Sequence, residues 1–118
     1  MTPDEFFAGN DRSKALFEVI LRELNVLTEV NVSASKSQIA FRRRTTFAAV
    51  WMPGQYLKRQ TVPLVLTIYL RARDPSPRWK QIVEPSHQRF THHLELNTVS
   101  DIDDQVRGWL HQAWDEAE

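Results

Sequence analysis

Arginine is the residue type in this sequence that is best suited to binding a ligand. Arg42-Arg43-Arg44 lies between two short apolar runs of strand type, and three unpaired charges are too costly to bury. A guanidinium group forms two parallel hydrogen bonds to a carboxylate or a phosphate. We therefore predict an anion-binding site on the outer face of a sheet, formed by Lys36, Ser37, Arg42, Arg44, Tyr69, Arg71, Arg89 and His93.

The residue types in the predicted site suggest separate roles. The arginines would supply charge and geometry, Tyr69 a platform for stacking or hydrogen bonding, and His93 a donor whose charge changes near neutral pH. The expected partner is a phosphate-bearing ligand, nucleic acid or an acidic protein segment. The alternative is that the arginines pair with carboxylates of the same chain, such as Glu84 or Glu95.

Trp79 has the sequence surroundings of a residue that stacks on single-stranded nucleic acid or on a nucleotide. It lies between Arg78 and Lys80, and Tyr56 and Lys58 place another aromatic residue beside a basic one. Surfaces that bind single-stranded nucleic acid combine aromatic side chains for stacking with basic ones for phosphates. The sequence has neither a ribonucleoprotein aromatic motif nor a helix-turn-helix pattern, so recognition of particular bases is not expected.

A protein-interaction or homodimerisation module is the alternative function. It would use an apolar patch of the sheet around Val50, Met52 and Val65. Replacing Arg42 and Arg71 with alanine distinguishes the two functions, because the change should abolish anion binding and spare association through an apolar patch.

Catalysis by residues of the predicted anion-binding site is a third possible function. Lys36, Ser37 and His93 could form a hydrolase or transferase site if folding brings them within hydrogen-bond reach. The chain has no Gly-x-Ser-x-Gly turn and no phosphate-binding glycine loop, which are common signatures of such enzymes. We assign no catalytic residue, and the pattern favours binding over catalysis.

The sequence predicts no metal ion and no cofactor. Cysteine is absent, which excludes disulfides and thiolate zinc sites. His92 and His93 are adjacent in a predicted strand, so they point to opposite faces and cannot bind one ion together. We expect His92 to be a core histidine with a backbone partner and His93 to lie on the outer face.

Helices are predicted at both ends of the chain. Thr2-Pro3-Asp4-Glu5 has the pattern of a helix start, and Gly9 would end that helix. A longer helix should follow, because apolar residues from Leu16 to Leu27 recur at three- and four-residue spacing. A last helix should begin after Ser100 as its cap, with aspartates in its first turn.

The residues between these helices alternate with the period of strands. Strands are predicted from Val30, on both sides of the arginine triplet, at Val62–Arg71 and at Arg89–Leu96, whereas residues 78–83 are too mixed to classify. Consecutive strands joined by short turns favour antiparallel pairing. We predict one α+β domain over residues 1–118, a two-layer sandwich in which an antiparallel sheet of four to five strands carries the N- and C-terminal helices on one face.

Charge is segregated along the chain although the formal net charge is zero. Residues 1–29 carry −3, residues 30–96 carry +8 and residues 97–118 carry −5. Such a division favours an anion-facing surface on the basic middle segment. No apolar run approaches the roughly 20 residues that cross a bilayer, and the start of the chain is acidic, so we predict a cytoplasmic protein without membrane contact.

Six segments of the chain resemble those of a known protein family. They are TPDEFF at 2–7, KSQIAFRR at 36–43, PLVL at 63–66, VEPS at 83–86, RFTHH at 89–93 and DDQVRGWL at 103–110. On these segments the chain resembles a bacterial family known as domain of unknown function 5655, nearly from end to end. The resemblance implies a stand-alone soluble module, and it implies no activity, cofactor or catalytic residue.

Overall fold

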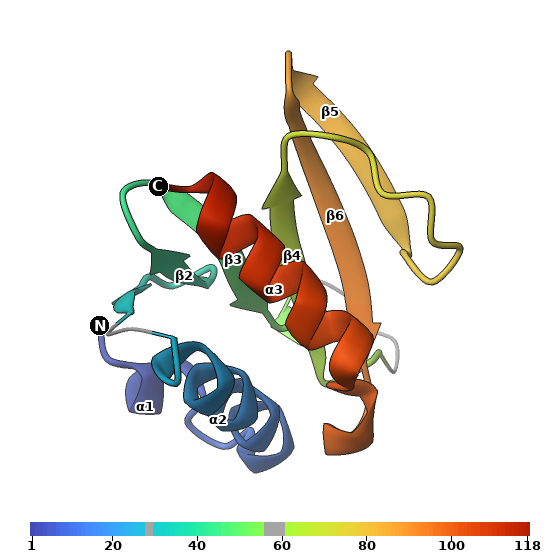
Figure 1. Cartoon of the computed structure of the whole chain (residues 1–118). Helices are drawn as coiled ribbons and strands as arrows, with labels where there is room; N and C mark the ends of the chain where they lie inside the picture. The colour runs from blue at the N-terminus through green and yellow to red at the C-terminus, as the bar shows by residue number, and fades with distance from the viewer. Residues whose placement is uncertain (28–29, 56–60) are drawn as a thin grey trace.

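Six strands form one antiparallel sheet in the computed structural model, which describes residues 1–27, 30–55 and 61–118 (Figure 1). Their order across the sheet is β1-β2-β3-β4-β6-β5, and every neighbouring pair is antiparallel. The predicted α+β class is confirmed, with one strand more than the upper number expected. The strands are β1 (Asn31–Ala34), β2 (Ile39–Arg42), β3 (Thr46–Trp51), β4 (Leu64–Leu70), β5 (Gln81–Ser86) and β6 (Arg89–Leu96).

The additional strand, β5, lies at one edge of the sheet and includes part of the segment that the sequence left unclassified. Ile82 alone among its side chains is half-buried, and the others are exposed. An edge strand with little burial has no apolar alternation for a pattern search to find. Pro85 is tolerated there because an edge strand can spare a backbone N–H.

The connection from β4 to β5 crosses over β6, which is inserted between them (Figure 1). Residues 71–80 make this crossover on the side of the sheet that carries the helices, where Asp74 contacts both His92 of β6 and Trp109 of the last helix. The chain then returns through a tight turn in which Gln88 has a φ of 57°. That left-handed conformation is uncommon for a residue other than glycine.

The first helix, α1 (Pro3–Phe6), starts as the sequence predicts. The Thr2 hydroxyl accepts a hydrogen bond from the Glu5 N–H, and the Glu5 carboxylate accepts one from the Thr2 N–H. This reciprocal arrangement satisfies two backbone donors at the helix start. Gly9, with a φ of 77°, separates α1 from the next helix.

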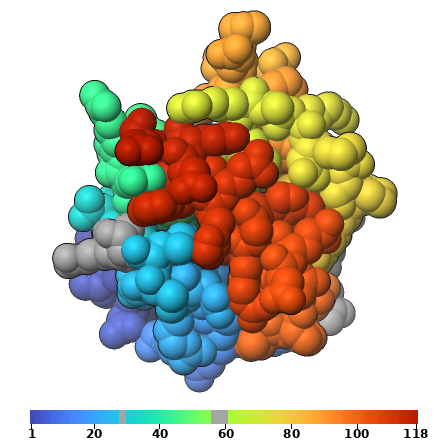
Figure 2. Space-filling model, viewed as in Figure 1, coloured from blue at the N-terminus to red at the C-terminus, as the bar shows by residue number. Residues whose placement is uncertain are grey.

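The two longer helices, α2 (Asp11–Asn25) and α3 (Asp104–Glu116), cover the same face of the sheet (Figure 1). In the space-filling view they form one continuous surface, α2 in blue and α3 in orange to red (Figure 2). The prediction that Ser100 caps the last helix is wrong. Asp103 is the cap and accepts from the Val106 N–H, because Ser100 belongs to a short 3-10 helix, Val99–Asp101, that precedes α3.

The core lies between these helices and the sheet. The even-numbered residues of β4 point toward the helices, as predicted for Leu64, Leu66, Ile68 and Leu70, and all four are buried. The expected apolar patch around Val50, Met52 and Val65 is wrong. Val50 and Met52 belong to this core, and Val65 on the other face is only 5% exposed, so the three residues offer no exposed surface for a partner.

Candidate functional site

A cavity of about 330 Å³ lies at one end of the sheet, where four segments distant in sequence meet. These are the β2–β3 turn, the end of β4, the β5–β6 turn and the C-terminal turn of α3. Four of the eight predicted site residues line it, namely Arg44, Tyr69, Arg71 and Arg89. We call it the arginine cavity, and its other lining residues are Thr45, Thr46, Phe47, Leu70, Gln88, Ala113, Glu116, Ala117 and Glu118.

Arg89 reaches the arginine cavity because the β5–β6 turn ends beside the last residues of β4. In the β4–β6 pairing, Tyr69 is opposite Thr91 and Leu70 is opposite Phe90. The guanidinium carbon of Arg89 lies 4.3 Å from the centre of the Tyr69 ring. This cation–π contact orients the side chain without consuming its hydrogen-bond donors.

Arg71 is tied to the end of α3. Its backbone N–H donates to Glu116 Oε1 at 2.9 Å, and its Nη2 donates to the Glu116 carbonyl oxygen at 2.6 Å. The last carbonyl groups of a helix have no partner within the helix and carry partial negative charge. Arg71 therefore stabilises the helix end and is only partly available to a ligand.

Arg43 makes a second contact of this kind next to the arginine cavity. Its guanidinium carbon lies 3.5 Å from the centre of the Trp114 ring, and its Nη1 donates to the Trp114 carbonyl oxygen at 3.1 Å. In Figure 2 the β2–β3 turn, in green, lies against the dark red C-terminal turn of α3. Arg43 and Arg71 together compensate the negative end of the helix.

Arg44 and Arg89 are the cationic side chains of the cavity that remain for a ligand. Both are exposed, and neither has an ion-pair partner among the residues that the structure describes. The lining contains three arginines against Glu116 and Glu118, which leaves a formal charge of +1. Arg44 and Arg89, which have no ion pair within the described ranges, lie at the β2–β3 and β5–β6 turns.

The other four predicted residues lie elsewhere. Lys36 and Ser37 are in the β1–β2 turn, where the Ser35 hydroxyl accepts from the backbone N–H groups of Ser37 and Gln38. That turn is at the opposite end of β2 from Arg44. Arg42 is exposed at the end of β2 and does not line the arginine cavity. It pairs with Asn31 of β1 and with Thr46 of β3, and the register of the β2–β3 pairing shifts between Phe41 and Arg42.

His93 lies in the middle of the outer sheet face, as predicted, but not in the arginine cavity. Trp51 Nε1 donates to the Thr67 hydroxyl at 3.0 Å, and that hydroxyl lies 2.8 Å from His93 Nδ1. Burial, followed by the charge of nearby His92, lowers the pKa of His93 below its usual value. This lowering of the pKa favours the neutral imidazole of His93 over its cation.

The structure does not bring Lys36, Ser37 and His93 together. The turn of Lys36 and Ser37 leads into β2, and β3 and β4 lie between β2 and the strand of His93. Three strand spacings correspond to roughly 14 Å, which is far beyond the reach of a hydrogen bond. The geometry gives no support to a hydrolase or transferase site on these residues.

A partly buried polar cluster around Asp74 is the feature that sequence reasoning missed. Asp74 Oδ1 accepts from Trp79 Nε1 at 3.0 Å, Asp74 Oδ2 accepts from Trp109 Nε1 at 3.1 Å, and the Asp74 N–H donates to His92 Nε2 at 3.0 Å. Burial is the largest effect and raises the pKa of Asp74, but the hydrogen bonds from Ser76, Trp79 and Trp109 outweigh it and lower the pKa overall. No local spacing signals this cluster, because its members are up to 35 residues apart.

The contacts in this cluster test the predictions for His92 and Trp79. His92 is fully buried, with Nδ1 3.1 Å from the Phe90 carbonyl oxygen, so the predicted core histidine with a backbone partner is confirmed. Trp79 is only 8% exposed and its indole N–H is used by Asp74, so the prediction that it stacks on nucleic acid is wrong. Tyr56 and Lys58, its expected companions, lie outside the described residues.

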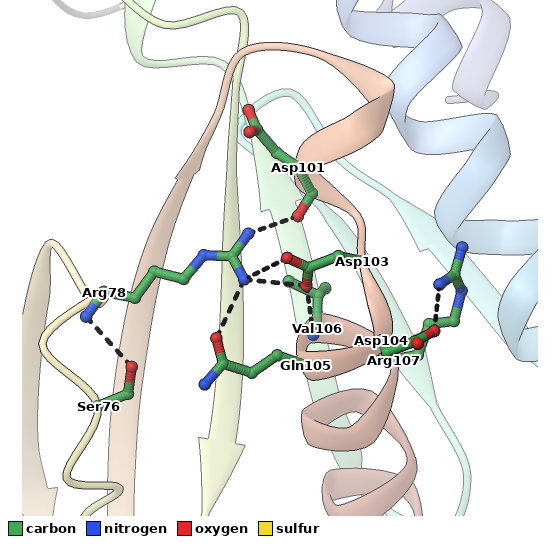
Figure 3. Close-up of polar contacts among 8 residues, drawn as sticks. All are labelled: Ser76, Arg78, Asp101, Asp103, Asp104, Gln105, Val106 and Arg107. Carbon is green, nitrogen blue, oxygen red and sulfur yellow. Dashed lines mark hydrogen bonds and ion pairs between the residues drawn. The ribbon is translucent and has the colours of Figure 1, made fainter.

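Arg78 fixes the crossover to the start of α3 (Figure 3). Its Nη1 donates to both carboxylate oxygens of Asp103 at 2.9 Å and to Gln105 Oε1 at 3.1 Å, while Nη2 donates to the Asp101 carbonyl oxygen at 2.6 Å. The hydrogen bond from Arg78 is the main cause of the lowered pKa of Asp103. Like Arg43 and Arg71, Arg78 is a basic residue of the middle segment that stabilises α3.

A second hollow in the structure has no charged side chain among its described lining residues. The hollow, of about 440 Å³, lies between α1, the start of α2 and the end of β3. Within residues 1–27, 30–55 and 61–118, no group of three or more histidine, aspartate or glutamate residues could hold a metal ion. In the same ranges, no helix is long and apolar enough to cross a membrane.

Comparison with protein families yields a match over nearly the whole chain. The model of a protein family described as "Domain of unknown function (DUF5655)" matches residues 3–117. The searches of curated proteins and of solved structures return no match.

Proposed function

The chain belongs to the DUF5655 family, and from this premise we propose that it is a binding domain for a small anionic ligand, which it holds in the arginine cavity. The observation that carries the proposal is the position of Arg44 and Arg89. They come from two turns that are 45 residues apart in sequence, and they flank one concave space with no ion-pair partner among the described residues.

The electrostatics of the surrounding residues support this assignment. The end of α3 brings the partial negative charge of its carbonyl groups to the cavity, and this charge alone would repel an anion. Arg43 and Arg71 compensate it through the Trp114 and Glu116 carbonyl oxygens. Glu118 in the lining partly offsets the charge of Arg44 and Arg89, and each of these arginines can donate charge-assisted hydrogen bonds, which contribute about 1.5–3 kcal/mol apiece.

A small ligand fits this arrangement better than a nucleic acid chain. Single-stranded nucleic acid needs a groove several nucleotides long with successive aromatic platforms. The arginine cavity is confined to one end of the sheet, and Tyr69 is the aromatic residue at its rim. A phosphate or carboxylate group attached to a small molecule matches both the size and the charge.

The experiment that tests the proposal is an NMR titration of the ¹⁵N-labelled protein with phenyl phosphate at low and at physiological salt. We expect amide shifts at Thr45, Leu70 and Gln88, and an affinity that weakens as salt rises. Arg44→Gln together with Arg89→Gln should reduce the affinity at least tenfold. Arg22→Gln, at an exposed position of α2, is the matched control and should leave the affinity unchanged.

Either of two results would reject the proposal. One is the absence of saturable shifts around the cavity, and the other is the same affinity in the double variant as in the unmodified protein. A single-stranded oligonucleotide serves as a second ligand, and tighter, strongly salt-dependent binding of it would replace the small ligand with nucleic acid.

A further inference from the structure

Neutral polar side chains accompany Arg44 and Arg89 in the lining of the arginine cavity. Thr45 and Gln88 are exposed, and Thr46 is half-buried. None of these three side chains has a hydrogen-bond partner in the part of the chain that the structure describes. A guanidinium group only donates hydrogen bonds, whereas a hydroxyl or a carboxamide also accepts them. The cavity can therefore bind a ligand that has hydrogen-bond donors as well as an anionic group.

These neutral groups come from the same two turns as the arginines. Thr45 and Thr46 follow Arg44 between β2 and the start of β3, and Gln88 precedes Arg89 in the β5–β6 turn. Each arginine thus has a neutral hydrogen-bonding residue next to it in sequence. An anion held by both arginines therefore lies near hydroxyl and carboxamide groups from both turns.

The apolar residues of the lining offer almost no surface to a ligand. Phe47, Leu70, Ala113 and Ala117 are at most 6% exposed, and side chains that are already buried gain little hydrophobic free energy from a further contact. The volume of about 330 Å³ nevertheless lies at the lower end of the range for small-molecule pockets, roughly 300–1,000 Å³. The cavity thus has room for a small organic molecule, and the groups that can hold it are polar.

Gln88 adopts a backbone conformation that favours glycine. Ser86 pairs with Arg89, so His87 and Gln88 are the two residues of the β5–β6 turn, and Gln88 has a φ of 57°. Turns with a positive φ at this position normally have glycine or asparagine there. Residues held in such conformations are concentrated at functional sites. A contact between the Gln88 carboxamide and the ligand accounts for a glutamine at a position where glycine would be more stable.

Resting on the proposed function, we infer that the ligand is a small, soluble, polyhydroxylated phosphate ester of the sugar phosphate type. Its phosphate group is bound by Arg44 and Arg89, and its hydroxyl groups form hydrogen bonds with Gln88 and Thr46. A phosphate suits two guanidinium groups from different turns better than a carboxylate does, because it presents three acceptor oxygens. The hydroxyl groups of the ligand donate to the carboxamide oxygen, a role that no guanidinium can fill.

The test compares two phosphate monoesters that share a cyclohexane ring. Cyclohexyl phosphate has no hydroxyl group on this ring, whereas myo-inositol 1-phosphate has one on each of the remaining ring carbons. NMR titrations of the ¹⁵N-labelled protein should give an affinity for the inositol phosphate that is roughly tenfold higher, the effect of one or two additional neutral hydrogen bonds. Inorganic phosphate should bind about as weakly as cyclohexyl phosphate.

A double variant locates the contact with the hydroxyl groups. Gln88→Gly together with Thr46→Val removes a carboxamide and a hydroxyl from the lining. It should reduce the preference for myo-inositol 1-phosphate by roughly threefold or more, while cyclohexyl phosphate still binds. Gln81→Ala, at an exposed position of β5 outside the cavity lining, is the control and should keep the preference.

The stability of the Gln88→Gly variant separates a ligand contact from a structural role. Glycine adopts a positive φ without strain, so this single variant should unfold at a higher urea concentration than the unmodified protein. A weaker preference for myo-inositol 1-phosphate in a more stable protein then reports the lost contact and not a damaged turn.

The outcomes distinguish this inference from the proposed function. Equal affinities for the two esters, both reduced in the Arg44→Gln and Arg89→Gln variant, would overturn the hydroxylated ligand and leave anion binding intact. Binding of neither ester would overturn both proposals. A preference that survives in the Gln88→Gly and Thr46→Val variant would also overturn the inference. Vesicles that contain phosphatidylinositol 4-phosphate present a similar head group on a membrane, and tighter binding to them than to myo-inositol 1-phosphate would replace the soluble ligand with a lipid.

Discussion

Arg71 donates two hydrogen bonds to Glu116, one from its backbone N–H to the carboxylate and one from its guanidinium to the carbonyl oxygen. The first residue after β4 is thereby joined to the last residue of α3. This contact closes one side of the arginine cavity and explains why a predicted ligand-binding arginine has a structural role as well. The three consecutive arginines 42–44 also differ, since Arg43 contacts Trp114 of α3, whereas Arg42 and Arg44 are exposed.

Substitution of Arg43 should lower the stability of the protein, whereas substitution of Arg44 should weaken ligand binding. Arg43→Ala removes the stacking on Trp114 and the hydrogen bond to its carbonyl oxygen, so we expect a loss of about 1–2 kcal/mol in the free energy of unfolding. Arg44→Ala should change stability by less than about 0.5 kcal/mol, as exposed surface positions do, and should weaken phosphate binding. Urea denaturation and NMR titration measure the two effects. Equal stability loss in both variants would contradict this division.

Asp74→Asn should strongly destabilise the protein. The carboxylate accepts hydrogen bonds from two indole N–H groups on its two oxygens, and an amide would direct an NH₂ group at one of these donors. We expect a loss of about 2–3 kcal/mol, because a buried donor is left without an acceptor. Denaturant unfolding followed by tryptophan fluorescence reports it. A loss below about 0.5 kcal/mol would show that the cluster contributes little.

Stability should fall as the pH decreases from 7 to 5. Burial lowers the pKa of His92 and of His93, so below the unfolded pKa of about 6.5 the unfolded chain binds more protons than the folded one. Stability then rises with pH, by at most about 1.4 kcal/mol per pH unit for each histidine. The stabilisation is complete above the unfolded pKa and is lost as the pH falls toward the folded one. Urea unfolding at pH 7, 6 and 5 checks the sign, and constant stability would refute it.

Arg78→Lys should keep the positive charge and lose most of the contact with α3. A lysine cannot bond both oxygens of Asp103 and the Asp101 carbonyl oxygen at once, so we expect about 1–2 kcal/mol lower stability. The pKa of Asp103 should rise toward its normal value, which NMR of the carboxyl carbon measures. Arg73→Lys, at an exposed position of the same crossover, is the control and should leave both quantities unchanged.

Glu118→Gln should strengthen anion binding. Glu118 is among the residues that line the arginine cavity, and its negative charge opposes that of Arg44 and Arg89. Removing it should raise the affinity for phenyl phosphate roughly two- to fivefold at low salt, and less at physiological salt because the site is open to screening. Glu95→Gln, an exposed carboxylate of β6 outside the cavity, should have no effect. An unchanged affinity in Glu118→Gln would mean that the ligand does not approach the end of α3.

Local patterns were sufficient to predict most of the secondary structure. The limits of β6 and the capping residues of α1 agree with the prediction, because both depend on residues only a few positions apart. β5 and the cap of α3 were not predicted correctly. In β5 the side chains are largely exposed, and at α3 several residues with good capping side chains stand close together in the sequence.

The candidate site was predictable only in part. The sequence indicates that Arg44, Tyr69, Arg71 and Arg89 are polar residues at the ends of strands, yet it groups them with Lys36, Ser37 and His93, which the sheet order places elsewhere. Residues near in sequence can lie at opposite ends of a strand, and only strand order tells which ends meet.

The sequence by itself determined the alternation of buried and exposed positions, the class of fold, the absence of cysteine chemistry and the excess of positive charge in the middle of the chain. These follow from residue types and short-range spacing. The tertiary structure decided which charges are used internally and which line the cavity. Arg43, Arg71 and Arg78 stabilise α3, while Arg44 and Arg89 stay without an ion pair among the described residues. That division depends on the packing of α3 against turns that are far from it in sequence, and no local pattern contains this information.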